Sequence, residues 1–274
     1  MKEVLDWESR AVAQIFDEAT LWSAPFGRLL LEHIPMVRGA SILDIGFGTG
    51  FPLIELSQRF GEPSKIYGID IWKEGIYRTE EKISTLEIGN VEIIEGSATE
   101  IPLGDEQIDL VTSNLGVNNF ERKEDVYREI HRVLKRGGHL ALTTNPIGTF
   151  EELFEIFGSI LGEMGLAKAQ TKLKEHIEHR NTTGGIQLEI ESFGFRLSKS
   201  KSDSTNIRFV DAAALLDHSL IRIGFRASWG SMVADGENRR RFFERLVGKV
   251  NHLVEVEGEF KMTIPMEYME FEKE

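Results

Sequence analysis

A glycine-rich stretch with one acid in it is where residue types and spacing point most directly to chemistry. Residues 42–52 read ILDIGFGTGFP, with three glycines after an apolar run and a carboxylate at Asp44. Glycine lets the backbone approach a ligand closely because it has no Cβ. Such a loop, between a buried strand and a helix, is typical of sites for nucleotide-containing molecules. The sequence therefore predicts a site of this kind.

The spacing favours S-adenosylmethionine over a dinucleotide. The dinucleotide fingerprint is G-x-G-x-x-G, but here the third glycine comes early, at Gly50, and Phe51 stands where the fingerprint has glycine or alanine. Asp44 would also repel a pyrophosphate, whereas it favours the cationic ammonium and sulfonium of S-adenosylmethionine. A second acid, Asp70, ends the next predicted strand, where a carboxylate can accept both ribose hydroxyls.

The elements that must position these residues alternate between short apolar runs and helical periodicity. A parallel sheet built from right-handed βαβ units follows from this alternation. Gly137 and Gly138 are expected to end the last of the helices. The expected strands are 41–46, 65–70, 91–97, 107–116 and 139–145, and the expected helices 50–60, 73–87 and 123–135.

After Pro146 the pattern becomes mostly helical. Strand character returns only at 195–202 and 258–270, and Pro265 requires a bulge or an edge position in the second of these. Helical patterns occupy 149–180, 185–193 and 209–256, the last with a loop near 229–236.

These features together resemble the class I S-adenosylmethionine-dependent methyltransferases. LDIGFGTG, YGIDIW, EGSATEIPL, IDLVTSNLG and EIHRVLKRGGHLAL follow the family's order and spacing over residues 40–146. SNLGVNNF followed by RVLKRGG is most similar to small-molecule methyltransferases, such as those of ubiquinone and menaquinone biosynthesis and the arsenite methyltransferases. The resemblance implies an α/β fold: a doubly wound, mostly parallel Rossmann-like sheet of about seven strands, with an antiparallel last strand and a helical cap.

The resemblance also implies which residues meet the cofactor. The family usually places an acid where this chain has Ser97, and that acid takes the adenine amino group. A hydroxyl can accept the same hydrogen bond, but without charge assistance. The implied cofactor-binding residues are Asp44, Gly46, Phe47, Gly48, Thr49, Gly50, Asp70, Ile71, Gly96, Ser97, Ala98 and Asn114.

No catalytic residue is assigned, because the sulfonium already activates the methyl group and the protein mainly aligns the reactants. Asn118 and Asn119 follow the fourth strand and could orient an acceptor or form turns. Trp22 and Phe26 could belong to a lid or to the core, and Trp229 is the aromatic candidate for a substrate wall.

Histidines and arginines favour structural roles. His176 and His179 lie three apart on a predicted helix, but no third metal ligand is evident, so we expect a solvated face and no metal. His218 lies in an apolar stretch and is expected to be buried. The run Arg239–Arg241 is expected on the solvated face of a helix.

Composition limits the partners. A net charge of -13 argues against a nucleic-acid substrate. The absence of cysteine excludes disulfides, thiolate metal sites and the arsenite branch of the family. No apolar run has the length of a membrane span, and the first residues lack a signal-peptide core, so we expect a cytoplasmic protein without a membrane partner.

The expected layout has four parts: N-terminal helices or a lid (1–39), the cofactor-binding core (40–146), a helical cap with a return strand (147–257) and a final strand (258–274). The function expected is S-adenosylmethionine-dependent methyl transfer to a small molecule. The alternatives are a protein or RNA methyltransferase, a non-catalytic S-adenosylmethionine-binding protein and a dinucleotide oxidoreductase. The oligomeric state is left open.

Overall fold

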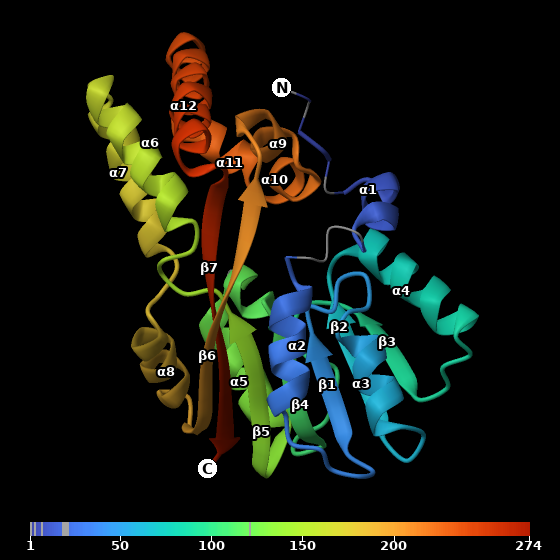
Figure 1. Cartoon of the computed structure of the whole chain (residues 1–274). Helices are drawn as coiled ribbons and strands as arrows, with labels where there is room; N and C mark the ends of the chain where they lie inside the picture. The colour runs from blue at the N-terminus through green and yellow to red at the C-terminus, as the bar shows by residue number, and fades with distance from the viewer. Residues whose placement is uncertain (1, 3, 7, 18–21, 121) are drawn as a thin grey trace. The chain divides into compact units, whose positions relative to one another are not determined.

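A seven-stranded sheet organises the chain in the computed structural model, which describes residues 2, 4–6, 8–17, 22–120 and 122–274 (Figure 1). Its strand order is β3-β2-β1-β4-β5-β7-β6, with β7 antiparallel to β5. The doubly wound sheet with an antiparallel last strand is confirmed. The strands are β1 (Ser41–Ile45), β2 (Lys65–Asp70), β3 (Val91–Glu95), β4 (Ile108–Asn114), β5 (Leu134–Thr144), β6 (Phe195–Phe209) and β7 (Phe260–Lys273).

Helices cover both faces of this sheet. α5 and α8 share a hydrophobic core with the strands, while α2 and α3 lie in front of the strands in Figure 1. The central strands β1 and β4 are buried along nearly their whole length, as expected of strands covered on both faces. The helices before residue 195 are α1 (Arg10–Ile15), α2 (Ala24–His33), α3 (Leu53–Phe60), α4 (Lys73–Thr85), α5 (Lys123–Val133), α6 (Glu151–Glu163), α7 (Ala167–Glu178) and α8 (Thr183–Glu191).

The strand order reverses between β1 and β4. From β1 the chain runs outward through β2 and β3, then returns to β4 on the other side. Connections diverge at this point, and open α/β sheets bind ligands there, beyond the carboxyl ends of the strands. The glycine loop follows β1 directly, so the topology places it at this point.

The chain divides into two compact units. The core unit comprises residues 8–145, 182–203 and 266–274, and the helical unit comprises 1–7, 146–181 and 204–265. Residues 8–39, α8 and the first part of β6 thus belong with the sheet. The expected layout instead grouped α8 with a helical cap and a return strand in residues 147–257. The later helices are α9 (Ala212–Asp217), α10 (Ser219–Gly224), α11 (Arg226–Ser231) and α12 (Gly236–Glu257).

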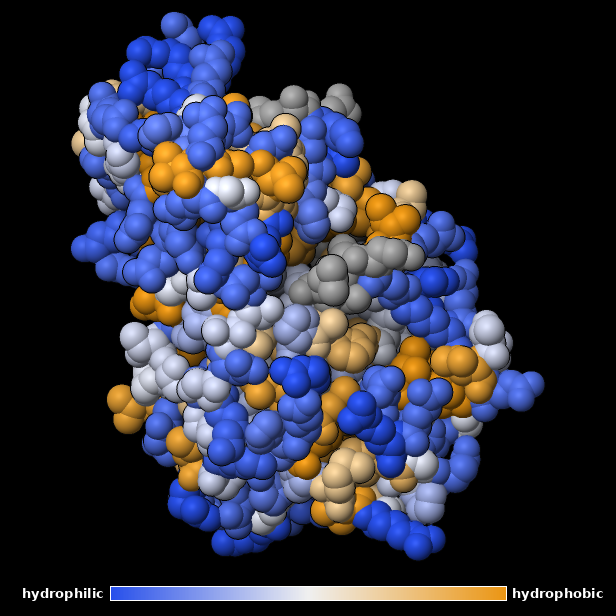
Figure 2. Space-filling view, viewed as in Figure 1, coloured by the Kyte–Doolittle hydropathy of each residue, from blue (hydrophilic) through white to orange (hydrophobic). Residues whose placement is uncertain are grey.

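An aromatic cluster fills the helical unit. The Phe157 ring lies edge-on to Trp229 at 5.5 Å and to Phe242 at 5.0 Å, between centroids. Phe150 meets Phe225 at 5.0 Å in the same way. Edge-to-face rings at these distances add to the stabilisation from burial. The outer surface in the view of Figure 2 is mainly hydrophilic, with separate hydrophobic patches.

Two local expectations are wrong and one is confirmed. α5 ends at Val133 and β5 begins at Leu134, so Gly137 and Gly138 lie inside the strand and do not end the helix. Trp229 lies within α11 and not in a loop. The expectation for Pro265 is confirmed: β7 runs between β5 and β6, but its pairing with β5 ends at Glu267, so Pro265 lies in a part of β7 that is an edge on that side, and its missing N–H interrupts none of those hydrogen bonds.

Candidate functional site

The glycine loop between β1 and α3 uses a left-handed backbone at all three glycines. The φ angles are 77° at Gly46, 56° at Gly48 and 104° at Gly50. A Cβ on Gly50 would crowd Ile54 at 2.9 Å, whereas a Cβ on Gly48 would meet only Trp72, at 4.0 Å. Gly50 is therefore required by packing, while Gly48 leaves its outer side open for a ligand.

Asp44 sits at the base of this loop and is completely buried. Its Oδ1 accepts a hydrogen bond of 2.7 Å from Thr112 Oγ1 on β4, and its Oδ2 is buried without a partner among the described residues. Burial raises the pKa of Asp44 to about 7; the Thr112 hydrogen bond opposes this rise, and the charge of Asp70 adds to it. Burial disfavours the ionised form of this carboxylate, so a cation or a hydrogen-bond donor beside Oδ2 would stabilise that form.

Asp70 ends β2 and holds the loop. Its Oδ2 accepts from the Gly48 N–H at 2.7 Å, and its Oδ1 accepts from the Trp72 N–H at 2.8 Å. Burial raises the pKa of Asp70, although these backbone hydrogen bonds oppose the rise. Each carboxylate oxygen has a second acceptor position, so both can still receive a ligand hydroxyl.

Thr49 connects the loop to the N-terminal segment and to α4. Its hydroxyl donates to Asp17 at 3.0 Å, and Lys82 donates to its carbonyl oxygen at 2.7 Å. Lys82 and Arg78 both form ion pairs with Asp17. The sequence-based prediction did not find Asp17, Arg78 or Lys82, because long-range ion pairs leave no local signal. Residues 18–21 of the predicted lid lie outside the described part of the chain.

The predicted adenine side follows β3. The Gly96 N–H donates to the Asp70 carbonyl at 2.9 Å, which places this turn next to the end of β2. Ser97 is exposed, and its hydroxyl accepts from the Thr99 N–H at 3.2 Å. Ile71 is 72% exposed and Ala98 is buried. An exposed apolar Ile71 beside an exposed hydroxyl suits a flat heterocycle with a polar edge.

Uncharged polar groups gather at the carboxyl ends of β4 and β5. Asn114 accepts from Thr143 Oγ1 at 2.7 Å and donates to the Ser23 carbonyl at 3.2 Å. Asn118 donates to Asn145 Oδ1 at 2.7 Å and accepts from Thr144 Oγ1 at 2.5 Å. Both asparagine side chains are therefore positioned by strand residues. Asn119 is exposed.

Leu115, between these asparagines, has a left-handed backbone with φ 64°. A non-glycine residue in this conformation is strained, and such strain clusters at functional sites. It turns the chain sharply into the short 3-10 helix Gly116–Asn119, which carries Asn118.

The aromatic candidates differ in burial, and only one of them is accessible to a ligand through its side chain. Phe26 and Trp229 are 0% exposed, so the structure packs both in an interior. Phe47 is 1% exposed, and its ring lies where a Cβ on Gly68 would stand, so only its backbone belongs to the loop surface. Trp22 is half-buried, with its ring 5.8 Å from Phe26, and stays a candidate for contact with a ligand.

The predicted pair His176 and His179 belongs to no cluster of potential metal ligands among the residues that the structure describes. Within the described residues no group of three or more His, Cys, Asp and Glu side chains could hold an ion. His179 is exposed as expected, but His176 packs edge-on against Phe154, and burial lowers its pKa to about 4. His218 is half-buried beside Phe209. Arg239–Arg241 lie exposed on α12, as predicted.

An open α/β sheet, a glycine loop at its switch point and acids after β1 and β2 define a nucleotide-cofactor protein of the Rossmann-like class. A family model described as a methyltransferase domain matches residues 37–206. The chain belongs to the class I S-adenosylmethionine-dependent methyltransferases, which confirms the resemblance.

Curated relatives match less than half of the chain. A demethylmenaquinone methyltransferase of Listeria monocytogenes is 35% identical over 123 residues, which are 44% of this chain and 52% of that protein. An arsenite methyltransferase of Halobacterium salinarum is 32% identical over 108 residues, 39% of this chain and 28% of the relative. The chain thus spans about half or less of the length of these relatives.

Solved structures share the fold. An S-adenosylmethionine-dependent methyltransferase from Aquifex aeolicus superposes with a TM-score of 0.55 and 21% identity, over 70% of this chain and 91% of the other.

Among the described residues, no helix is both long enough and apolar enough to traverse a bilayer.

Proposed function

We propose that the protein binds S-adenosylmethionine and transfers its methyl group to a small-molecule acceptor. The observation that carries the cofactor assignment is Asp44, whose buried Oδ2 has no partner in the described residues beneath a loop that is open at Gly48. A cationic ligand would compensate that carboxylate, whereas the pyrophosphate of a dinucleotide would not.

The residues present fit this cofactor. Asp44 and the loop backbone would hold its amino-acid part, Asp70 its ribose, and Ile71 with Ser97 its adenine. When bound, S-adenosylmethionine supplies an activated methyl group. The protein would then orient the acceptor and exclude water, and the Asn118 amide, fixed by Thr144 and Asn145, is our candidate for that orientation.

A small acceptor is favoured over a macromolecule. The net charge of -13 opposes binding to RNA, and the relatives named above act on a demethylated menaquinone and on arsenite. Arsenite is disfavoured here because the chain has no cysteine. A cytoplasmic location belongs to the same proposal and rests on the sequence alone.

Calorimetry with S-adenosylmethionine and NAD side by side tests the cofactor. We expect S-adenosylmethionine and its demethylated product to bind and NAD to give no signal; binding of NAD alone would contradict the proposal. Transfer of a labelled methyl group to pooled small molecules, proteins or RNA then separates the acceptor classes. A tight cofactor complex without transfer to any acceptor would favour the non-catalytic alternative, whose support is the missing acid at Ser97.

A further inference from the structure

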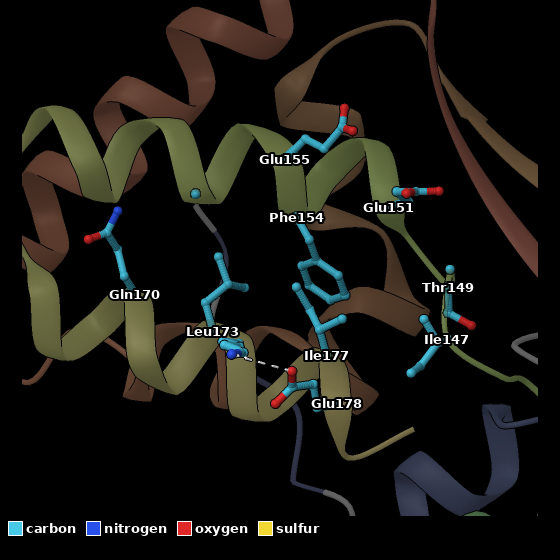
Figure 3. A pocket seen from close by; sticks show the side chains of 12 residues that line it. Ile147, Thr149, Glu151, Phe154, Glu155, Gln170, Leu173, Ile177 and Glu178 are labelled. Carbon is cyan, nitrogen blue, oxygen red and sulfur yellow. Dashed lines mark ion pairs between the residues drawn. The ribbon is translucent and has the colours of Figure 1, made fainter. Parts of the chain in front are cut away.

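A groove in the helical unit lies between α6 and α7. Its volume is about 420 Å³. Phe154, Leu173 and Ile177 line it and point into the space between the two helices (Figure 3). This volume lies within the range of small-molecule pockets, roughly 300–1,000 Å³, and apolar walls are typical of them.

Carboxylates outnumber cations around this groove. Glu151, Glu155 and Glu178 line it together with one lysine, Lys174. Lys174 lies 3.7 Å from Glu178, as the dashed line in Figure 3 marks. Glu151 and Glu155 are exposed and form no ion pair with any residue that the structure describes. The two carboxylates give the groove a negative potential that attracts cations and repels anions.

Gly158 leaves space at one wall of the groove because it has no side chain. It lies inside α6, where glycine destabilises a helix relative to alanine. Packing does not require glycine here, because a Cβ would meet only Leu173, at an ordinary contact distance of 3.9 Å. A larger side chain at this position would instead extend towards Leu173 and occupy the groove.

We propose that this groove binds a small amphipathic cation. Its apolar body would lie against Phe154, Leu173 and Ile177, and its cationic nitrogen beside Glu151 and Glu155. The proposal goes beyond methyl transfer, because it uses none of the residues of the glycine loop and its test needs no cofactor.

Octyltrimethylammonium, used below its micelle-forming concentration, is the probe, with octanoate and octanol as matched anionic and neutral chains. Calorimetry on the whole protein should show the ammonium binding at least about tenfold more tightly than octanoate. The double variant Glu151→Gln/Glu155→Gln should lose that preference, while Glu175→Gln, an exposed acid on α7 outside the groove, should keep it.

Gly158→Leu should abolish binding by filling the groove, and Gly158→Ala, which adds only a Cβ, should retain it. Circular dichroism on the same samples establishes that both variants are folded. Equal affinity for octanoate and the ammonium, no binding of the ammonium at millimolar concentration, or unchanged binding by folded Gly158→Leu would each overturn the proposal.

Discussion

Asp44 makes cofactor binding depend on pH. Because its pKa is raised to about 7, the empty protein holds Asp44 mostly protonated at pH 6 and mostly ionised at pH 8. A cationic cofactor prefers the ionised form, so we expect the affinity for S-adenosylmethionine to fall below pH 7 by up to about tenfold per pH unit. Calorimetry between pH 5.5 and 8.5 measures this slope.

The matched variant is Asp44→Asn, which should bind weakly with little slope in the same range. A wild-type affinity that is flat with pH would contradict the assignment of the cation to Asp44. In the empty protein the raised pKa also affects stability. Protonated Asp44 favours the folded state, and this contribution to the free energy of unfolding is lost as the pH rises from about 4 to about 7.

Asp70 is expected to contribute to binding both directly and through the loop. Asp70→Ala removes the proposed ribose partner and leaves the N–H groups of Gly48 and Trp72 without their acceptor. Affinity for S-adenosylmethionine should drop by about 2 kcal/mol, read from a titration.

Asp109→Ala is the control for Asp70→Ala, since Asp109 also accepts from a backbone N–H, that of Ser41 at 2.9 Å, but at the start of β1. Equal affinity of the Asp70 variant and the wild type would contradict the placement of the ribose.

At the residue scale, sequence reasoning finds groups that belong to local motifs. Asp44 and Asp70 were predicted because each ends an apolar run beside the glycine loop. Thr112 was not, because its hydrogen bond to Asp44 depends on the register between β1 and β4, which pairs these two residues across parallel strands. Register between non-consecutive strands leaves no mark in the sequence.

At the element scale, the glycine loop should tolerate no branched side chain at its centre. Gly48→Val adds strain at φ 56° and fills the open side of the loop, so cofactor binding should be lost while the fold persists. Gly39→Val is strain-matched, with φ 74° outside the loop, and should keep binding. Circular dichroism and titration on both variants check this; binding by Gly48→Val at wild-type affinity would refute it.

α11 should stabilise the helical unit through Trp229. Trp229→Ala removes a fully buried ring and should lower the free energy of unfolding by about 3–5 kcal/mol. Trp229→Phe should cost much less, because the indole N–H has no hydrogen-bond partner among the described residues. Denaturant titration measures both. If Trp229→Ala left the stability unchanged but abolished turnover, the result would support a role for Trp229 in the substrate wall instead.

Element types were predictable where apolar periodicity was strong, as in β1, β2 and α5. The expectation failed at Gly137-Gly138, because a glycine pair after a helical pattern signals its end, while tertiary pairing draws the chain from Leu134 onward into β5. The length of β6, 15 residues, was also missed. Most of its side chains are exposed or half-buried, so no apolar alternation marks its outer half.

At the scale of the whole molecule, the helical unit is expected to respond to ligands. We predict that residues 204–256 exchange amide hydrogens faster than β1 in the empty protein and slow when cofactor product and acceptor are both present, as a cap over the acceptor would. Hydrogen exchange with mass spectrometry measures both. Protection equal to that of β1 without ligand would contradict the cap.

The division into units could not be read from the sequence. The expected cap, residues 147–257, included a return strand at 195–202, whereas its helices before that strand were all expected outside the core. In the structure α8 and residues 195–203 belong to the core unit before the chain leaves it again. Ile186 and Ile190 of α8 pack into the core beneath the sheet. Their apolar spacing predicts a helix with a buried side, but not which core receives it.

Because β7 lies inside the sheet, the order of synthesis limits when the sheet can be completed. Translation delivers β7 after the other six strands, yet β7 lies between β5 and β6, so β5 has an unpaired edge while residues 145–259 are made. An unpaired edge can recruit other strands. Since the register joins His139 to Glu272 and Thr144 to Glu267, only a chain synthesised through these residues can pair this edge. We therefore expect nascent chains stalled before residue 260 to need chaperones more than released protein does.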